Sequence, residues 1–238
     1  MTDLSCYFKL DNRFYYQEVL TMAFDGFVIS NIISELNKQI IGGRIYKIYQ
    51  PEADEITLVI KKERLTTRLH LSASASLPLV YLSKEGKANP MQAPNFCMLL
   101  RKHISSGRII SITQPDFERI IEIKIEHLDE LGDVCQKRLI VEIMGKHSNI
   151  IFVNNDDVIL DSIKHISANI SSVREVLPGR AYTFPPSKGK HPLASLTADD
   201  FYQHIIKKPL NLCKALYTSI TGMSPLIANE LCYRAGLD

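Results

Sequence analysis

Residues 118–128 read ERIIEIKIEHL and residues 137–144 read KRLIVEIM, and these two stretches decide the fold class. In each, apolar residues occupy every second position, which is typical of a β-strand that buries one face. These residues are Ile121, Ile123 and Ile125 in the first stretch, and Leu139, Val141 and Ile143 in the second. The positions between them are Glu122 and Lys124, then Ile140 and Glu142. The pattern predicts an antiparallel meander with one buried face, because strands of parallel sheets are buried on both faces.

Further strands are predicted on both sides of this pair, because the period of two recurs. They are residues 44–50, 55–62, 66–73, 79–83, 107–113, 149–154 and 158–166. Two segments have helical spacing instead, residues 27–40 and 93–107. We expect Gly42 and Gly43 to end the first helix and Gly107 to end the second, since glycine favours the left-handed cap.

The last part of the chain is predicted to be helical. Thr197 is placed to cap its first helix. Residues 221–224, TGMS, lie between two later helices and resemble a helix-hairpin-helix, although Ser224 stands where a second glycine is usual. The final helix runs to Asp238 without a stop signal, so we expect a fragment of a longer protein.

The predicted fold class is α+β. Residues 22–195 are expected to form an antiparallel sheet or sandwich domain with flanking helices. A Pro-, Gly- and Lys-rich linker over residues 178–192 leads into the helical part, residues 196–238.

The chain has 238 residues, a formal net charge of +2 and 45% hydrophobic residues, which is ordinary for a globular protein. Any nucleic-acid surface must therefore come from local clustering of cations. The five cysteines form no C-x-x-C pair, which argues against a disulfide framework and a cysteine zinc site. No apolar run approaches the roughly 18–20 residues of a membrane span, and the N-terminus lacks a signal-peptide core. We expect a cytoplasmic protein with reduced thiols and no membrane contact.

Residues 144–150, MGKHSNI, look most like a binding site. A phosphate-binding P-loop would need glycine at Ile140, Ser or Thr at His147, and a helix where a strand is predicted. A metal site would need more ligands than His147 supplies. We interpret the stretch as a strand–turn–strand connection with Lys146 and His147 at its tip, where they could meet a polyanion.

Residues 101–108, RKHISSGR, hold four basic residues and no acid: Arg101, Lys102, His103 and Arg108. Two interpretations stay open, a solvated helix face and a surface that contacts phosphates. Glu118 and Arg119 have the same ambiguity, because neighbouring opposite charges often form surface ion pairs of little energetic value.

Five stretches, taken in order, resemble the N-terminal domain of the NFACT family. They are residues 22–51 (MAFDGF onward), 95–109, 117–121 (FERII), 141–154 (VEIMGKHSNIIFVN) and 176–186 (VLPGRAYTFPP). The family includes bacterial proteins long called fibronectin-binding protein A-like and the eukaryotic nuclear export mediator factor. The resemblance covers residues 22–238 and leaves residues 1–21 as an N-terminal extension.

This resemblance implies a role in ribosome quality control. Members of the family bind a large ribosomal subunit that carries a stalled peptidyl-tRNA, and in bacteria they recruit alanine tRNA for untemplated alanine tailing. A sheet domain related to formamidopyrimidine-DNA glycosylases and a helix-hairpin-helix part are implied, usually followed by a coiled coil and an RNA-binding domain.

The family's Asp-Arg pair, which serves tRNA binding, falls on Glu118 and Arg119, where the acid is one methylene longer. The RNA contacts expected from the resemblance and the basic clusters are Arg119, Glu118, Arg101, Lys102, Arg108, Lys146 and His147.

Two other functions remain open. The older family name implies a surface adhesin that binds fibronectin, which would need export. A DNA glycosylase would need an N-terminal proline nucleophile, but Met1 is followed by Thr2 and Met22 by Ala23. No nucleophile–base motif stands out elsewhere, so we expect no enzymatic activity, no cofactor and no metal.

Overall fold

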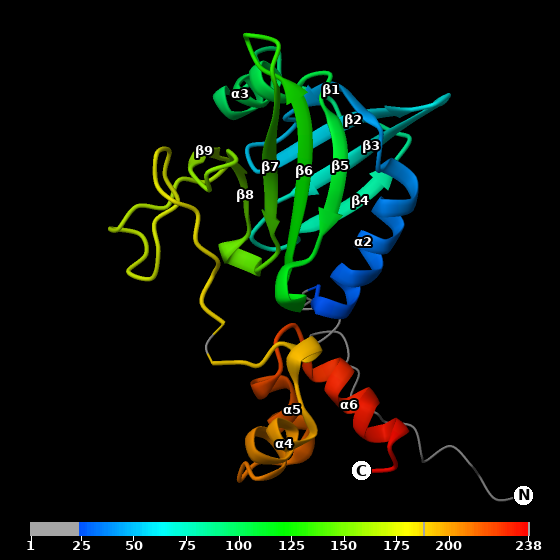
Figure 1. The fold of residues 1–238 in the computed structure, drawn as a ribbon, viewed down its shortest axis with the longest axis vertical. Coiled ribbons are helices and arrows are strands. Elements are labelled where there is room, and N and C mark those ends of the chain that lie inside the picture. Colours follow the sequence, from blue (N-terminus) through cyan, green and yellow to red (C-terminus); the bar gives the residue numbers. More distant parts are fainter. Residues whose placement is uncertain (1–23, 188, 238) are drawn as a thin grey trace, which may run out of the picture.

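The computed structural model describes residues 24–187 and 189–237, so the predicted extension over residues 1–21 lies outside the described residues. Its strands form one antiparallel sheet in the order β4-β3-β2-β1-β5-β6-β7-β8-β9 (Figure 1). The strands are β1 (Arg44–Tyr49), β2 (Glu55–Lys62), β3 (Leu65–Ser72), β4 (Leu79–Ser83), β5 (Arg108–Thr113), β6 (Ile120–Leu128), β7 (Val134–Glu142), β8 (Asn149–Val153) and β9 (Ile159–Ser162).

Helices pack on this sheet or lie at one end of it (Figure 1). They are α2 (Gly26–Ile40), α3 (Asn95–Ile104), α4 (Ala198–Phe201), α5 (Leu212–Ser219) and α6 (Pro225–Arg234). The short helical turns are η1 (Pro115–Phe117), η2 (Gly145–His147), η3 (Leu193–Ser195) and the π-helical η4 (Tyr202–Ile206). The predicted α+β class, an antiparallel sheet with flanking helices, is confirmed.

The main hydrophobic core lies between the inner face of the sheet and helices α2 and α3. The alternating residues of β6 and β7 point into it as predicted, and Ile123 and Val141 are completely buried. Strand register between β1 and β5 is limited to the pair Arg44 and Arg108, with backbone hydrogen bonds on either side of it. The sheet turns there, so that β1–β4 lie behind β5–β7 in Figure 1.

The prediction that β6 and β7 bury only one face is wrong at one end of the sheet. Ile140 and Glu142, which alternation places on the solvent side, have no exposed surface. A second apolar cluster covers them, to which Val176 and Tyr182 contribute from the long segment after β9. The alternation rule fails here because a distant segment folds over the outer face.

The glycines predicted to end α2 and α3 have different roles in the structure. Gly42 has φ +79° directly after α2, so its predicted role at that helix end is confirmed. At the end of α3 the left-handed residue is Ser106 (φ 64°), not Gly107. A β-carbon at Gly107 would come within 2.8 Å of the side chain of Ile125, so this glycine serves a close approach between chains instead.

The C-terminal helices pack as a separate cluster at one end of the sheet (Figure 1). Thr197 caps α4 as predicted, in a capping box with Asp200. Phe27 of α2 packs into the same apolar cluster as α5 and α6 and so links it to the sheet. Among the described residues, no helix is both long and apolar enough to cross a membrane. The four described cysteines, Cys97, Cys135, Cys213 and Cys232, are all unpaired.

Candidate nucleic-acid interface

The residues predicted to contact RNA fall at opposite ends of the sheet. Arg119 precedes β6, and its carbonyl oxygen accepts a hydrogen bond from the amide of Ile143 at the end of β7 (2.9 Å). Lys146 and His147 follow in η2, so they belong to this end as well. Lys102 instead lies beside Glu130, beyond the other end of β6 (3.4 Å). The nine residues of β6 put about 27 Å between the two groups.

The turn before Arg119 is strained. Asp116 and Phe117 both have positive φ, 44° and 61°, although neither is glycine. Non-glycine residues in this region cost about 1 kcal/mol or more each, and they persist only where the surroundings hold them. The side chain of Gln114 braces the turn, because its Nε2 donates to the carbonyl oxygens of Gly26 and Glu118, each at 2.9 Å.

Phe117 is held between two glycines from distant parts of the chain. A β-carbon at Gly26 would lie 2.5 Å from the carbonyl oxygen of Phe117, and one at Gly222 only 2.1 Å from it. The Gly26 amide also donates to the carbonyl of Gly222 (2.7 Å). On the other side, the ring of Phe117 packs edge to face with Phe27 (4.8 Å between centroids). The strained turn is therefore fixed by both α2 and the α5–α6 hairpin.

We call the contact of this turn with α2 and the α5–α6 hairpin the joint. Two linked N-caps also belong to it. Asp25 caps α2 by accepting from the amide of Val28, and Ser224 caps α6 by accepting from the amide of Ile227. The hydroxyl of Ser224 also donates to the second carboxylate oxygen of Asp25 (2.6 Å). Helices α2 and α6 are thus joined by a hydrogen bond between their N-cap side chains.

Glu118 and Arg119 emerge from this joint, and both side chains are half-buried. Burial raises the pKa of the Glu118 carboxyl, while the charge of Arg119, its backbone amide and Lys190 oppose that rise. Within the described residues, the Arg119 guanidinium makes no ion pair within 4 Å. A half-buried arginine on a braced turn is a pre-organised group for one anionic oxygen or a pair of them.

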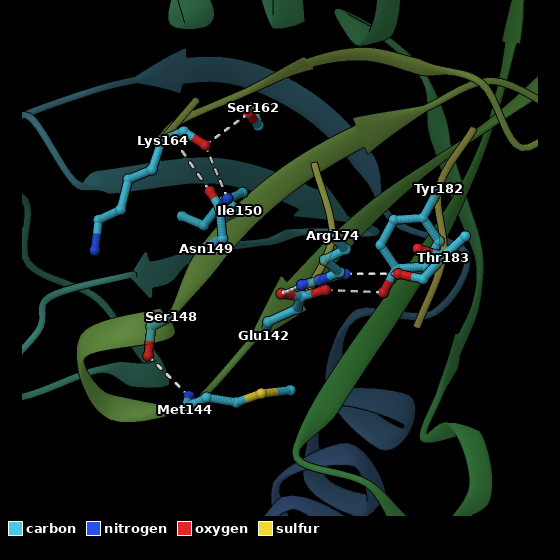
Figure 2. A network of polar contacts seen from close by, with 10 residues as sticks. All are labelled: Glu142, Met144, Ser148, Asn149, Ile150, Ser162, Lys164, Arg174, Tyr182 and Thr183. Carbon is cyan, nitrogen blue, oxygen red and sulfur yellow. Dashed lines mark hydrogen bonds and ion pairs between the residues drawn. The ribbon is translucent and has the colours of Figure 1, made fainter. Parts of the chain in front are cut away.

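The neighbouring turn, η2, stands on a rigid polar base that Figure 2 shows. The amide of Met144 donates to the hydroxyl of Ser148 (2.8 Å), which closes the turn. Asn149 ties its far side to the backbone of Lys164 through two hydrogen bonds, of 2.9 and 3.1 Å. The exposed side chains of Lys146 and His147 project from this base, as predicted from the MGKHSNI stretch.

Beside η2, the buried carboxylate of Glu142 anchors the covering segment. It pairs with the guanidinium of Arg174 and accepts from the hydroxyl of Tyr182 at 3.0 Å (Figure 2). Arg174 also donates to the carbonyl of Thr183 (2.6 Å). Burial raises the pKa of Glu142, and Arg174 opposes this rise.

The RKHISSGR stretch does not form one basic surface with Arg119. Arg101 is half-buried, and its Nε donates to the carbonyl of Ile48 (2.9 Å). Lys102 is exposed beside Glu130, and Arg108 opens β5 on the outer face of the sheet. The helix that carries Arg101 and Lys102 lies at the end opposite Arg119, because β5 and β6 run the length of the sheet between them (Figure 1).

Sequence reasoning missed the residues that build the joint. Gly26, Phe117 and Gly222 each lie in a stretch singled out in the sequence, but nothing in their local pattern says that they meet. The dipeptide Pro115–Asp116 signals a turn, which was the available local hint. In the part of the chain that the structure describes, no group of three or more His, Cys, Asp or Glu side chains is placed to hold a metal ion.

The resemblance seen in the sequence is supported by comparison with known proteins. A family profile for the NFACT N-terminal and middle domains matches residues 25–238. The chain belongs to the NFACT family. Among curated NFACT relatives, the Rqc2 homolog RqcH of Bacillus subtilis is 40% identical over 217 residues, which is 91% of this chain and 38% of that protein. The chain therefore spans well under half the length of this relative.

Two further similar proteins bear on function. The ribosome quality control complex subunit NEMF of Homo sapiens is 24% identical over 165 residues, 69% of this chain and 14% of that protein. Among solved structures, the N-terminal domain of the fibronectin-binding protein PavA from Streptococcus pneumoniae has a TM-score of 0.80 at 37% identity. That match covers 87% of this chain and 78% of the PavA domain.

Proposed function

We propose that this chain is the RNA-binding N-terminal part of a cytoplasmic, ribosome-associated quality control protein. It binds tRNA, with alanine tRNA as the expected species, together with a large ribosomal subunit that carries a stalled nascent chain. In that complex it promotes untemplated alanine tailing and has no enzymatic activity, cofactor or metal of its own. The names of its relatives RqcH and NEMF support a role in ribosome quality control.

The observation that carries the proposal is the strained turn that presents Arg119. A turn with two left-handed non-glycine residues is costly to keep, and here two glycines and the half-buried side-chain amide of Gln114 hold it in place. Arg119 stands where the family's tRNA-binding arginine is expected. The turn before it is braced, and its guanidinium is free of ion pairs among the described side chains, which suits bidentate contact with RNA.

The nearby η2 turn extends this surface. Lys146 and His147 are exposed at the same end of the sheet as Arg119, in the turn that follows β7. In the proposal, Lys146 contacts a backbone phosphate and His147 a phosphate or a 2′-hydroxyl. Glu118 restrains the guanidinium of Arg119 through its charge. The kinship of the sheet domain with formamidopyrimidine-DNA glycosylases and the nucleic-acid role of the helix-hairpin-helix belong to the same proposal.

A surface adhesin is the second candidate, because the similar PavA domain is named for fibronectin binding. The two functions differ in where the full-length protein resides and in what it binds. RNA recovered with the tagged full-length protein, purified from cells under mild salt, discriminates between them. We expect alanine tRNA and large-subunit rRNA to be enriched. Surface-exposed protein that carries fibronectin and no enriched RNA would reverse the order of the two candidates.

A further inference from the structure

Three cations stand side by side on the outer face of the sheet, at the end opposite Arg119. Arg108 of β5 is in register with Arg44 of β1, and Arg44 is in register with Lys61 of β2. Residues in register on neighbouring antiparallel strands share a face, with β-carbons about 5 Å apart. All three side chains are exposed. We call Arg108, Arg44 and Lys61 the cation row.

The cation row is an unfavourable arrangement for stability alone. Like charges directly opposite each other on neighbouring strands repel, and cross-strand pairs of opposite charge would be preferred. Elsewhere cations do form ion pairs: Lys87 pairs with Glu55 (2.6 Å), and Arg138, although in register with Lys124, pairs with Glu122 (3.2 Å). Within residues 24–187 and 189–237, no member of the row forms an ion pair, although Glu126 lies in register with Arg108. Three neighbouring cations that form no ion pair with the protein are suited to bind an anionic ligand.

An exposed aromatic ring organises further cations beside the row. A β-bulge between Ile45 and Lys47 turns both Tyr46 and Lys47 outward. The ammonium of Lys61 lies 3.4 Å from the ring centroid of Tyr46, and that of Lys47 lies 5.5 Å from it. Cation–π contact holds these charges in place without neutralising them. The side chain of Tyr46 remains 53% exposed.

The backbone group that contacts the cation row is neutral, so it does not cancel the positive charge of the row. The guanidinium of Arg44 donates to the carbonyl of Ser106 (3.1 Å), a neutral acceptor that orients it across the β1–β5 junction. Gly42 leaves open space beside the guanidinium of Arg108, which would lie 3.8 Å from a β-carbon there. Arg44 is therefore oriented by this bond, and both arginines are accessible on the outer face.

We propose that the outer face of β5, β1 and β2, centred on the cation row with Tyr46 and Lys47, is a second RNA-binding surface. It grips backbone phosphates independently of the Arg119 end. Charged groups spaced across the strands suit a polyanion chain, and an exposed ring among cations is typical of nucleic-acid surfaces. The inference shares the proposed RNA-binding function but concerns a separate face, about 23 Å from Arg119 along β6, because Arg108 is in register with Glu126.

The test compares charge-matched double variants of the chain. Arg44→Gln with Lys61→Gln removes two cations from the row. Arg180→Gln with Arg234→Gln removes two exposed cations that already pair with Glu175 and Glu230. Fluorescence anisotropy measures binding of a labelled RNA stem-loop, and of a single-stranded oligouridylate of equal length, over a salt series. Thermal unfolding of each variant is recorded in parallel.

We expect the row variant to bind the stem-loop roughly ten-fold more weakly at low salt, with the slope of log K against log salt reduced by about 1 to 2. Its melting temperature should equal or exceed that of the wild type, because a repulsion is removed. The control variant should keep both affinity and slope. Equal binding by the row variant and the wild type, or an equal loss in the control, overturns the proposal.

Arg119→Gln, measured beside these variants, separates this inference from the proposed function. A loss confined to the row variant supports the second surface even if Arg119 proves irrelevant to RNA. A loss confined to Arg119→Gln rejects the second surface and leaves the proposed function standing.

Discussion

The carbonyl oxygen of Phe117 lies so close to Gly222 that a β-carbon there would come within 2.1 Å of it. These residues belong to different parts of the fold, the turn before β6 and the hairpin between α5 and α6. Their contact fixes the turn that presents Arg119, and the same glycine accepts a hydrogen bond from Gly26 (2.7 Å). The C-terminal helices therefore act as a support for the candidate interface.

Gly222→Ala should be strongly destabilising. The residue has φ +70°, so alanine pays a conformational penalty of about 1–2 kcal/mol, and its methyl group meets backbone that cannot yield. We expect a total loss of about 3 kcal/mol or more in guanidinium unfolding. Gly179→Ala is the matched control, because Gly179 has φ +81° and nothing within 4 Å of its would-be β-carbon. Equal losses in both variants would show that the contact with Phe117 carries no energy.

Local pattern was enough to predict most of the sheet. The period of two between Ile121 and Ile125, and the glycines after residue 40, depend on short-range sterics and the burial of one face. The MGKHSNI turn followed in the same way, since its spacing and the strand after it exclude a P-loop.

The joint and the buried outer face could not be predicted, because both depend on pairings distant in sequence. Phe117 contacts Gly222, more than a hundred residues further along the chain. Glu142 is covered by a segment that includes Arg174, about thirty residues after it. The placement of Arg101 and Arg119 at opposite ends of the sheet likewise follows from strand register. A list of basic residues along the chain contains no such information.

Glu142→Ala should destabilise the fold by about 3–5 kcal/mol, because it leaves the largely buried guanidinium of Arg174 without its counter-charge. The hydroxyl of Tyr182 loses its acceptor as well. Urea unfolding measures this loss. Glu175→Ala is the comparison, since it breaks a pair with the exposed Arg180 and a long hydrogen bond from the amide of Ala168 (3.3 Å), and it should cost about 1 kcal/mol. Similar losses in the two variants would contradict the anchoring role of Glu142.

Stability should fall as the pH drops below neutrality, partly through His70. Burial lowers the pKa of His70, and its ring contacts the hydroxyl of Thr57 (3.0 Å) and the carbonyl of Glu85 (3.2 Å). Because the folded pKa lies below the unfolded value of about 6.5, the unfolded chain takes up protons first as the pH falls. Burial also lowers the pKa values of His103 and His127, so their contributions have the same sign.

The measurement is the urea midpoint between about pH 7.5 and about pH 5.5. In His70→Gln the midpoint should depend less on pH than in the wild type. An identical pH dependence in His70→Gln and the wild type would contradict the assignment to His70.

The most direct test of the account is the affinity of the full-length protein for tRNA when Arg119 is replaced by glutamine. Arg180→Gln serves as the charge-matched control, because that guanidinium already pairs with Glu175 (3.1 Å). We predict roughly ten-fold weaker binding for Arg119→Gln and a salt slope less steep by about 0.7–0.9, with no change for the control. Unaltered affinity and slope in a folded Arg119→Gln protein would contradict it.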